Sequence, residues 1–409
     1  MECNTFIAKM QVPQAGEPVA AKSVCQALLR VKDRRGKRGQ RYPAPVVLTL
    51  MLLAKLAGEK TVSGIAQWVR LRAAWVREQL PFKDERLSCA NTYQYVCDHV
   101  DVDELNQSLG ELFAPAPGAV VSVPPTGPTE TAAAGVVQLA VDGKSLRGTR
   151  RTSPAKAAEQ VVGLYNVTEQ AMVRQRSIVS KGKERAAAFA LIDGLDLQGC
   201  VVSADALHTQ PRWCRTILQQ HGDYLVIAKR NQSELRQAHP GGTRLLFSEP
   251  PRPCLFPEVT AHSVDKQHGR LEVRHLRSSA ELSDYLAPHW PGVAQVFQVE
   301  RTVTRQDRTT HELAYGMTSL PATRLSPHDL LTLIRTHWHI ENRSHWRRDV
   351  TLGEDACRVT LGQTPQVLAT LNNTVLALVD HLHLPNLAAA IRQFAAQPAN
   401  ALALLLSPL

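Results

Sequence analysis

The chain has 409 residues, 44% of them hydrophobic, so it is long enough to bury the cores of two or three domains. Its 47 lysines and arginines outnumber its 37 acidic residues and give a net charge of +10, which favours polyanionic partners. Eight cysteines without a Cys-x-x-Cys pair argue against a zinc ribbon and a secreted disulfide framework. We find no export signal and no apolar run of membrane-spanning length, so we expect a cytoplasmic protein without a membrane partner.

The first part of the chain has the pattern of a small helical domain. Apolar residues recur at helical spacing from Val24 to about Phe113, which predicts an all-α domain within residues 1–113. At its entry, seven of the twelve residues 30–41 are basic. The alternative to a DNA-binding arm is an ordinary solvated charge run. We expect contacts with DNA phosphates from Arg34, Arg35, Lys37, Arg38 and Arg41.

Residues 114–134 contain five prolines among small residues, which predicts a semi-rigid linker. Beyond it, strand and helix patterns alternate. Strands are expected at 136–141, 160–167, 172–179, 199–204 and 223–228, with helices at 183–195 and 209–220. By analogy, this order of elements is that of a ribonuclease-H-like core, so we expect an α/β catalytic domain over residues 135–380.

The rest of that domain contains an insertion and a final helix. Residues 231–320 have strand-like pieces and many turn residues, which predicts a β-rich insertion. Ser326 and the proline after it form a helix start, and this helix is expected to run to about residue 348. We expect Trp338 and Trp346 to be core anchors rather than base-stacking platforms. Residues 381–409 are predicted to form a helical tail.

Three acidic residues occupy positions suited to a metal centre. Asp142 and Asp205 each end a predicted strand, and Glu341 lies on the final helix. If the two strands are adjacent and parallel, their equivalent ends lie only about 5 Å apart. Carboxylate clusters of this kind hold two Mg²⁺ or Mn²⁺ ions for phosphodiester cleavage. Taken singly, each strand-end aspartate is more often a turn former.

Basic side chains near these acids are candidates for holding DNA phosphates. The predicted contacts are Lys144, Arg147, Lys229, Arg230, His345 and Arg348. A zinc site formed by His337, Glu341 and His345 is an alternative, although its spacing does not match His-Glu-x-x-His. Glu354 and Asp355 are rivals of Glu341 for the third acidic position.

Several segments resemble bacterial insertion-sequence transposases of the DDE class, specifically the H-repeat-associated (ISAs-type) group. Residues 140–148, 204–210 and 335–355 resemble the blocks that carry that group's two aspartates and its glutamate. Residues 33–43 and 65–68 resemble the associated N-terminal domain. The wider class has a Tyr-x-x-Arg-x-x-x-Glu pattern that this chain does not keep, and Arg348 stands where a lysine is usual.

The resemblance implies a transposase that binds terminal inverted repeats, cleaves them with metal-activated water and transfers the strand to target DNA. Asp142, Asp205 and Glu341 would hold two magnesium ions. The basic arm would dock double-stranded DNA, within a homodimer, in a bacterial cytoplasm and associated with the nucleoid. The alternative is a domesticated, catalytically inactive DNA-binding protein derived from such an element.

Overall fold

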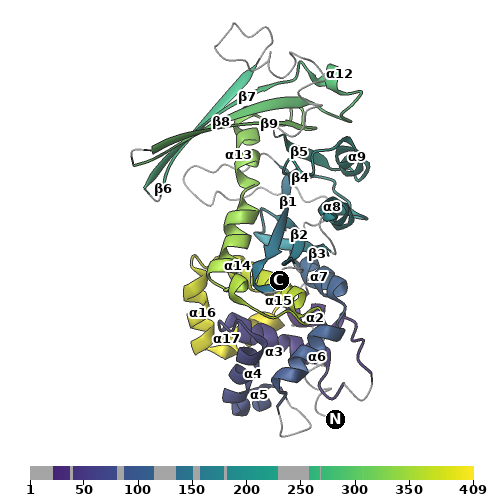
Figure 1. Cartoon of the computed structure of the whole chain (residues 1–409), viewed down its shortest axis with the longest axis vertical. Helices are drawn as coiled ribbons and strands as arrows, with labels where there is room; N and C mark the ends of the chain where they lie inside the picture. The colour runs from purple at the N-terminus through teal and green to yellow at the C-terminus, as the bar shows by residue number, and fades with distance from the viewer. Residues whose placement is uncertain are drawn as a thin grey trace. The chain divides into compact units, whose positions relative to one another are not determined.

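The computed structural model describes residues 22–36, 40–80, 87–114, 135–150, 157–178, 182–228, 258–267, 269–306 and 308–409 (Figure 1). The predicted linker at 114–134 lies almost entirely outside these residues, as do four predicted DNA contacts, Lys37, Arg38, Lys229 and Arg230. The chain divides into two compact units. Unit 1 comprises Met1–Ala114, Gly143–Ala187 and Glu341–Leu409, and unit 2 comprises Pro115–Asp142 and Ala188–Ile340.

Unit 1 is mainly helical. Its N-terminal helices are α2 (Val24–Leu29), α3 (Ala44–Leu56), α4 (Val62–Leu71), α5 (Ala73–Gln79), α6 (Ala90–His99), α7 (Val102–Gly110) and η2 (Glu111–Phe113). A 3-10 turn η3 (Arg147–Thr149) and the antiparallel strands β2 (Glu159–Asn166) and β3 (Ala171–Ile178) follow. Its last helical elements are the π-helical turn η4 (Ile340–His345), α14 (Trp346–Val350), η5 (Glu354–Ala356), α15 (Thr364–His381), α16 (Leu387–Ala396) and α17 (Pro398–Leu406).

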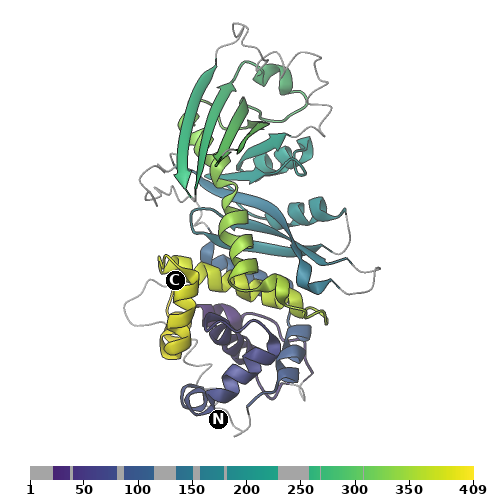
Figure 2. The same cartoon turned by 60° about the vertical axis from the view of Figure 1, so that its left-hand side comes forward.

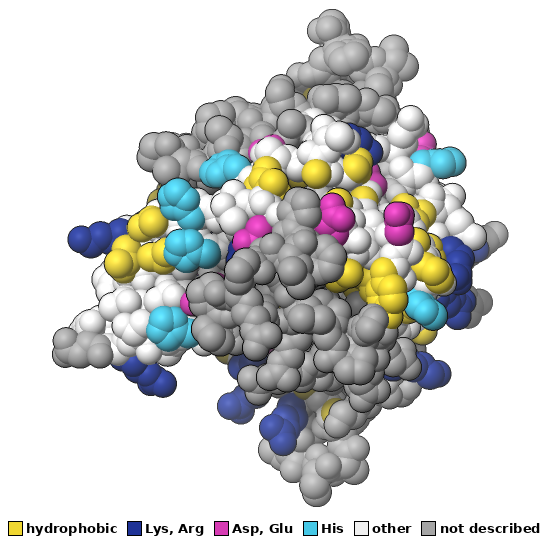
Figure 3. Space-filling model, turned by 90° about the horizontal axis from the view of Figure 1, so that it is seen from above, with side chains coloured by type: hydrophobic (Ala, Val, Ile, Leu, Met, Phe, Trp, Pro, Cys, Tyr) yellow, Lys and Arg dark blue, Asp and Glu magenta, His cyan; other side chains and the backbone are white. Residues whose placement is uncertain are grey.

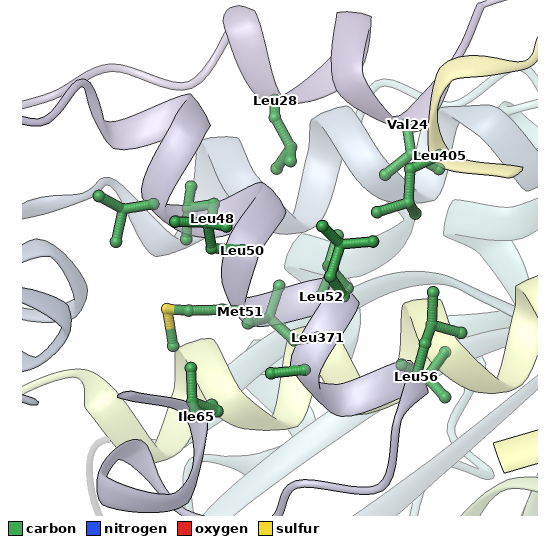
Figure 4. Close-up of a cluster of buried hydrophobic side chains, with 14 of the residues drawn as sticks. Val24, Leu28, Leu48, Leu50, Met51, Leu52, Leu56, Ile65, Leu371 and Leu405 are labelled. Atoms are coloured by element: carbon green, nitrogen blue, oxygen red, sulfur yellow. The ribbon is translucent and has the colours of Figure 1, made fainter. Parts of the chain in front are cut away.

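The core of unit 1 is built around α3. This helix is apolar on every side and twelve of its thirteen residues are buried, as expected for a helix that other helices surround. Leu371 of α15 and Leu405 of α17 belong to the same cluster as α3 (Figure 4). The C-terminal helices therefore complete the core of the N-terminal ones, a grouping that differs from the linear division expected from the sequence.

Unit 2 is a sheet with helices on its faces. Its elements are β1 (Val137–Leu146, which continues into unit 1), α8 (Glu184–Ile192, shared in the same way), β4 (Cys200–Ala204), α9 (Pro211–Gln219), β5 (Asp223–Ala228), β6 (Val259–Gln267), β7 (Arg270–Ser279), α12 (Ser283–Leu286), β8 (Gln295–Arg305), β9 (Arg308–Thr318) and α13 (Pro327–Thr336). β1 pairs in parallel with β4, and β4 with β5. β9 joins β5 in antiparallel fashion and leads into the antiparallel strands β8, β7 and β6.

The strand order of the sheet is β3-β2-β1-β4-β5-β9-β8-β7-β6. Its first five members have the ribonuclease-H-like order, and the last four form the β-rich insertion. The predicted fold class, an α/β core with a β-rich insertion after a small helical region, is therefore confirmed. Within the insertion, the sequence pattern predicts strands at 271–276, 293–304 and 312–317, which correspond to β7, β8 and β9, but it predicts no strand at β6.

Helix α13 covers one face of the unit 2 sheet and α9 lies on the other (Figures 1 and 2). Leu330, Leu331, Leu333 and Ile334 of α13 pack into a cluster with Leu225, Phe297 and other strand residues. Figure 3, seen from the end where β6–β9 lie, shows several histidine side chains at the surface. His262 and His275 stack across β6 and β7 with ring centroids 6.4 Å apart.

Helix α13 begins as expected, because the Ser326 side chain accepts a hydrogen bond from the Asp329 backbone and Pro327 is its first residue. It does not run unbroken to residue 348. The helix ends at Thr336, and a π-helical turn and the short α14 follow. Side chains bond to the Leu333 carbonyl near this point, and such insertions into the backbone ladder bend helices. In the described part of the chain, no helix combines the length and the apolar character that crossing a bilayer requires.

Candidate active site

The first two candidate acids occupy matching positions on neighbouring strands. Val141 of β1 pairs in register with Ala204 of β4, and the two strands are parallel. Asp142 and Asp205 each follow immediately after these paired residues. The adjacent parallel strands on which the sequence argument depended are therefore present in unit 2. Both side chains are half-buried.

Asp205 also has the local role that strand-end aspartates commonly have. One oxygen, Oδ1, accepts a hydrogen bond at 3.3 Å from the backbone of Leu207 in the turn after β4. The backbone carbonyl of the same residue accepts from His208 at 3.0 Å. The turn therefore fixes the direction in which the Asp205 side chain leaves the strand.

A buried network of polar side chains lies nearer the starts of the two strands that carry these acids. The side-chain amide of Gln138 in β1 donates to the Ser203 hydroxyl at 2.9 Å and to the Leu333 backbone carbonyl at 2.8 Å, while the Thr336 hydroxyl donates to Oε1 of Gln138. Ser203 of β4 also hydrogen-bonds with His337 Nδ1 at 3.0 Å. These bonds fix the height and rotation of α13 on the two strands that carry the aspartates.

The same network bears on the alternative zinc site, because it includes His337. His337 is buried against Ser203 and is not a member of the described group that could hold a metal ion. A site formed by His337, Glu341 and His345 is therefore not supported.

Glu341 lies in the π-helical turn of unit 1 beside His345. Its Oε2 is 3.0 Å from His345 Nδ1; the glutamate side chain is 55% exposed, whereas the histidine side chain is 4% exposed. The hydrogen bond from His345 lowers the pKa of Glu341, and burial lowers the pKa of His345. The pair is thus an ionised carboxylate held by a neutral imidazole. Short π-helical turns occur frequently at functional sites.

Glu341 and His345 of unit 1 belong to a group of side chains that could hold a metal ion. Glu341 is one of the three predicted acids, whereas the sequence suggested His345 as a DNA contact. Carboxylate oxygen is the ligand that Mg²⁺ and Mn²⁺ prefer, so the predicted acids suit these ions.

Two cations expected to contact DNA are buried and occupied by acidic partners. Lys144 is 2.6 Å from Asp349, and Arg348 is 2.7 Å from Glu354. Arg348 has no exposed surface. Neither side chain can reach a phosphate from this position, so we assign both of them to holding the segment around Glu341 in place.

Glu354, a rival for the third acidic position, is part of a buried network. Burial would raise the pKa of this carboxyl, but Arg348 and a hydrogen bond from Asn372 outweigh that effect and hold it below its usual value. Asn372 also accepts a hydrogen bond from Lys55 at 2.8 Å. Glu354 is therefore a structural anion, and the Glu341 position is the better fit for a ligand.

The cations of the basic arm differ in exposure. Arg35 is buried, with its guanidinium 2.7 Å from Asp33 and from the Tyr42 carbonyl, so it holds the arm's own fold rather than a phosphate. Arg34 is exposed, although it pairs with Asp101, and Arg41 is exposed beside Tyr42. Near the acids, the side chain of Arg147 is 80% exposed.

The two tryptophans near Glu341 are not core anchors. Trp338 is 51% exposed and Trp346 is 56% exposed, so the sequence-based expectation is wrong for both. A helix continuing regularly from α13 would have placed positions 341, 345 and 348 on one face. The π-helical turn changes that phase, and Arg348 points inward while Trp346 faces solvent.

Two family profiles match the chain. Residues 25–112 match the domain described as DDE_Tnp_1-associated, and residues 137–378 match the Transposase DDE domain. The chain belongs to the transposase DDE domain family. The predicted family is confirmed by this match and by the names of similar proteins.

Two similar proteins come from Escherichia coli strain K12. The H repeat-associated putative transposase YhhI is 27% identical over 249 residues, and the putative protein YbfL is 28% identical over 249 residues. Both matches span 59% of this chain and 63% of the relative, so under two thirds of each relative's length is covered. A solved synaptic complex of piggyBac transposase with hairpin DNA has a TM-score of 0.42 and 9% identity, covering 92% of this chain and 75% of that one.

Proposed function

We propose that this protein is the DNA transposase of an insertion sequence, which binds terminal inverted repeats, cleaves DNA at them and transfers the strand to target DNA. The observation that carries the proposal is the register of β1 and β4, which sets Asp142 beside Asp205 in a chain of the transposase DDE family. Paired carboxylates on adjacent strands suit metal-assisted phosphodiester chemistry better than a purely DNA-binding role.

Asp142, Asp205 and Glu341 would hold the divalent cations, two Mg²⁺ or Mn²⁺ ions. When bound, these ions would activate an attacking oxygen and stabilise the leaving one. The chain's own contribution is orientation. The Gln138–Ser203 hydrogen bond ties together the strands of the two aspartates, and the ion pair between Lys144 and Asp349 secures the segment after Glu341.

DNA contacts are proposed for the cations Arg34, Arg41 and Arg147, which are exposed at the surface. Lys37, Arg38, Lys229 and Arg230 remain predictions from the sequence. Pairing of two DNA ends calls for a homodimer. A nucleoid-associated location in a bacterial cytoplasm follows from the proposed substrate.

The proposal is tested with labelled duplexes taken from the two ends of the element that carries this coding sequence. With Mg²⁺, the wild type should nick these duplexes at the element's end. Asp205→Asn and Glu341→Gln should each cleave at least about 100-fold more slowly, because loss of a ligand exceeds the 10- to 100-fold effect typical of a ligand's supporting partner.

The matched control is Asp284→Asn, which removes an exposed acid of α12 and should cleave like the wild type. Binding to the ends without any cleavage by the wild type would favour the inactive DNA-binding derivative. Cleavage by Asp205→Asn at the wild-type rate would refute the proposed centre.

A further inference from the structure

His345 is a buried imidazole whose partner is mostly exposed. Its side chain is 4% exposed, and Nδ1 lies 3.0 Å from Oε2 of Glu341, four residues earlier in the π-helical turn. Glutamate side chains at a surface usually sample several rotamers, and fixing one of them costs side-chain entropy. A buried hydrogen-bond partner such as His345 can hold the Glu341 side chain in one rotamer before a cation binds.

The direction of the hydrogen bond follows from the chemistry of the two groups. An ionised carboxylate only accepts hydrogen bonds, so Nδ1 of His345 must carry the hydrogen and donate it.

The backbone that carries the His345 ring is fixed by ion pairs of the short helix α14, which follows it. Three residues beyond His345, the buried guanidinium of Arg348 bonds to Glu354 at 2.9 Å, and Asp349 pairs with Lys144. Both pairs fix α14, which begins directly after His345. The imidazole is thus attached to a rigid segment, while the glutamate projects from that segment toward solvent.

We infer that His345 is a positioning residue, which donates its Nδ1–H to Glu341 and holds that carboxylate in the orientation that binds a divalent cation. This inference rests on the proposed function, since it assigns a partner to the proposed ligand. It replaces the DNA contact that the sequence suggested for His345. Partners that orient ligands in this way typically contribute 10- to 100-fold in metal affinity.

The test compares the Mn²⁺ affinity of two variants, His345→Asn and His345→Gln, whose side-chain amides differ in length. Asparagine presents its N–H close to the place of Nδ1, whereas glutamine presents it close to the place of Nε2. We expect His345→Asn to bind Mn²⁺ within about threefold of the wild type, and His345→Gln to bind it at least about tenfold more weakly. Free Mn²⁺ is measured by electron paramagnetic resonance, with no DNA present, and circular dichroism verifies that each variant is folded.

His289→Asn is the control, because it replaces an exposed histidine of unit 2 and should leave Mn²⁺ affinity unchanged. Wild-type affinity in folded His345→Gln would overturn the inference, as would equal losses in both variants, which would mean that the ring itself is a ligand. Cleavage by the wild type separates the two proposals: if it cuts DNA and His345→Gln binds Mn²⁺ normally, only the inference fails. If the wild type neither binds Mn²⁺ nor cuts, the proposed function fails and takes the inference with it.

Discussion

Arg348 and Glu354 give a sharp prediction, because sequence and structure assign Arg348 different roles. The pair is buried, with Arg348 Nε donating to Glu354 at 2.9 Å and a second guanidinium nitrogen 2.7 Å from the other oxygen. Arg348→Met leaves the carboxylate buried without its cation. Breaking a buried pair from one side costs about 3–5 kcal/mol, because the remaining charge is uncompensated.

A loss of that size lowers the thermal midpoint of a unit of this size by roughly 6–20 °C. The double variant Arg348→Met with Glu354→Leu removes both charges and should recover part of the loss. Recovery stays incomplete because the Asn372 amide loses its acceptor, at about 1–3 kcal/mol. The assay is thermal unfolding followed by circular dichroism, with DNA affinity measured on the same samples below the midpoint.

The result that would refute this reasoning is specific. If Arg348→Met unfolds within about 1 kcal/mol of the wild type but binds DNA several-fold more weakly, with a smaller salt dependence, then Arg348 contacts a phosphate. Greater destabilisation by the double variant than by the single one would also contradict the buried-pair account.

Three further perturbations probe the packing around the site. Ser203→Ala removes the hydroxyl that Gln138 and His337 share, so urea unfolding should show a loss of about 1–3 kcal/mol. Burial lowers the pKa of Lys55 from 10.5 to about 8, so the unfolded chain binds more protons between these values and stability rises with pH there. From pH 7 to 9.5 the wild type should gain about 2 kcal/mol relative to Lys55→Met. Gly110→Ala should destabilise by about 3 kcal/mol or more, because its Cβ would lie 1.7 Å from a carbonyl oxygen of β3.

The control for the glycine is Gly36→Ala, whose Cβ meets no atom within 4 Å and which should unfold like the wild type. Wild-type stability in Gly110→Ala would contradict the close approach of α7 to β3. An identical pH dependence in the wild type and Lys55→Met would show that Lys55 is not buried as described. Unchanged unfolding of Ser203→Ala would mean that its hydroxyl bonds are dispensable.

Elements with strong local patterns could be predicted from the sequence. The first half of β1 and the whole of β5 are short apolar runs, and α13 has a serine and a proline at its start. Strand β1 continues past its predicted end at residue 141 to Leu146, so Asp142 lies within the strand. Strand β6 escaped notice because Val259–Gln267 forms the sheet's edge and exposes alternate residues, so it has no continuous apolar run. Its strand character depends on pairing with β7, which a local pattern does not contain.

The candidate site was predictable only in part. Asp142 lies in β1 and Asp205 directly follows β4, and these strands have the parallel pairing that the sequence argument required as a condition. The roles of Arg348 and His345 were not predictable, since both depend on the π-helical turn that breaks regular helical spacing. Glu354, the partner of Arg348, lies beyond the helix, so the helical pattern does not indicate this ion pair. The burial of Arg348 and His345 depends on tertiary packing, which a local pattern does not contain.

Metal coordination by the paired aspartates is tested most directly by exchanging one ligand for a softer one. Asp205→Cys replaces an oxygen with sulfur, which Mg²⁺ binds poorly and Mn²⁺ tolerates better. The measurement is the ratio of DNA cleavage rates in Mn²⁺ and Mg²⁺, for wild type and variant. The account predicts that Asp205→Cys loses cleavage in Mg²⁺ and regains a substantial part of it in Mn²⁺, so that its ratio far exceeds that of the wild type. Undiminished cleavage by the variant in Mg²⁺ would contradict the account.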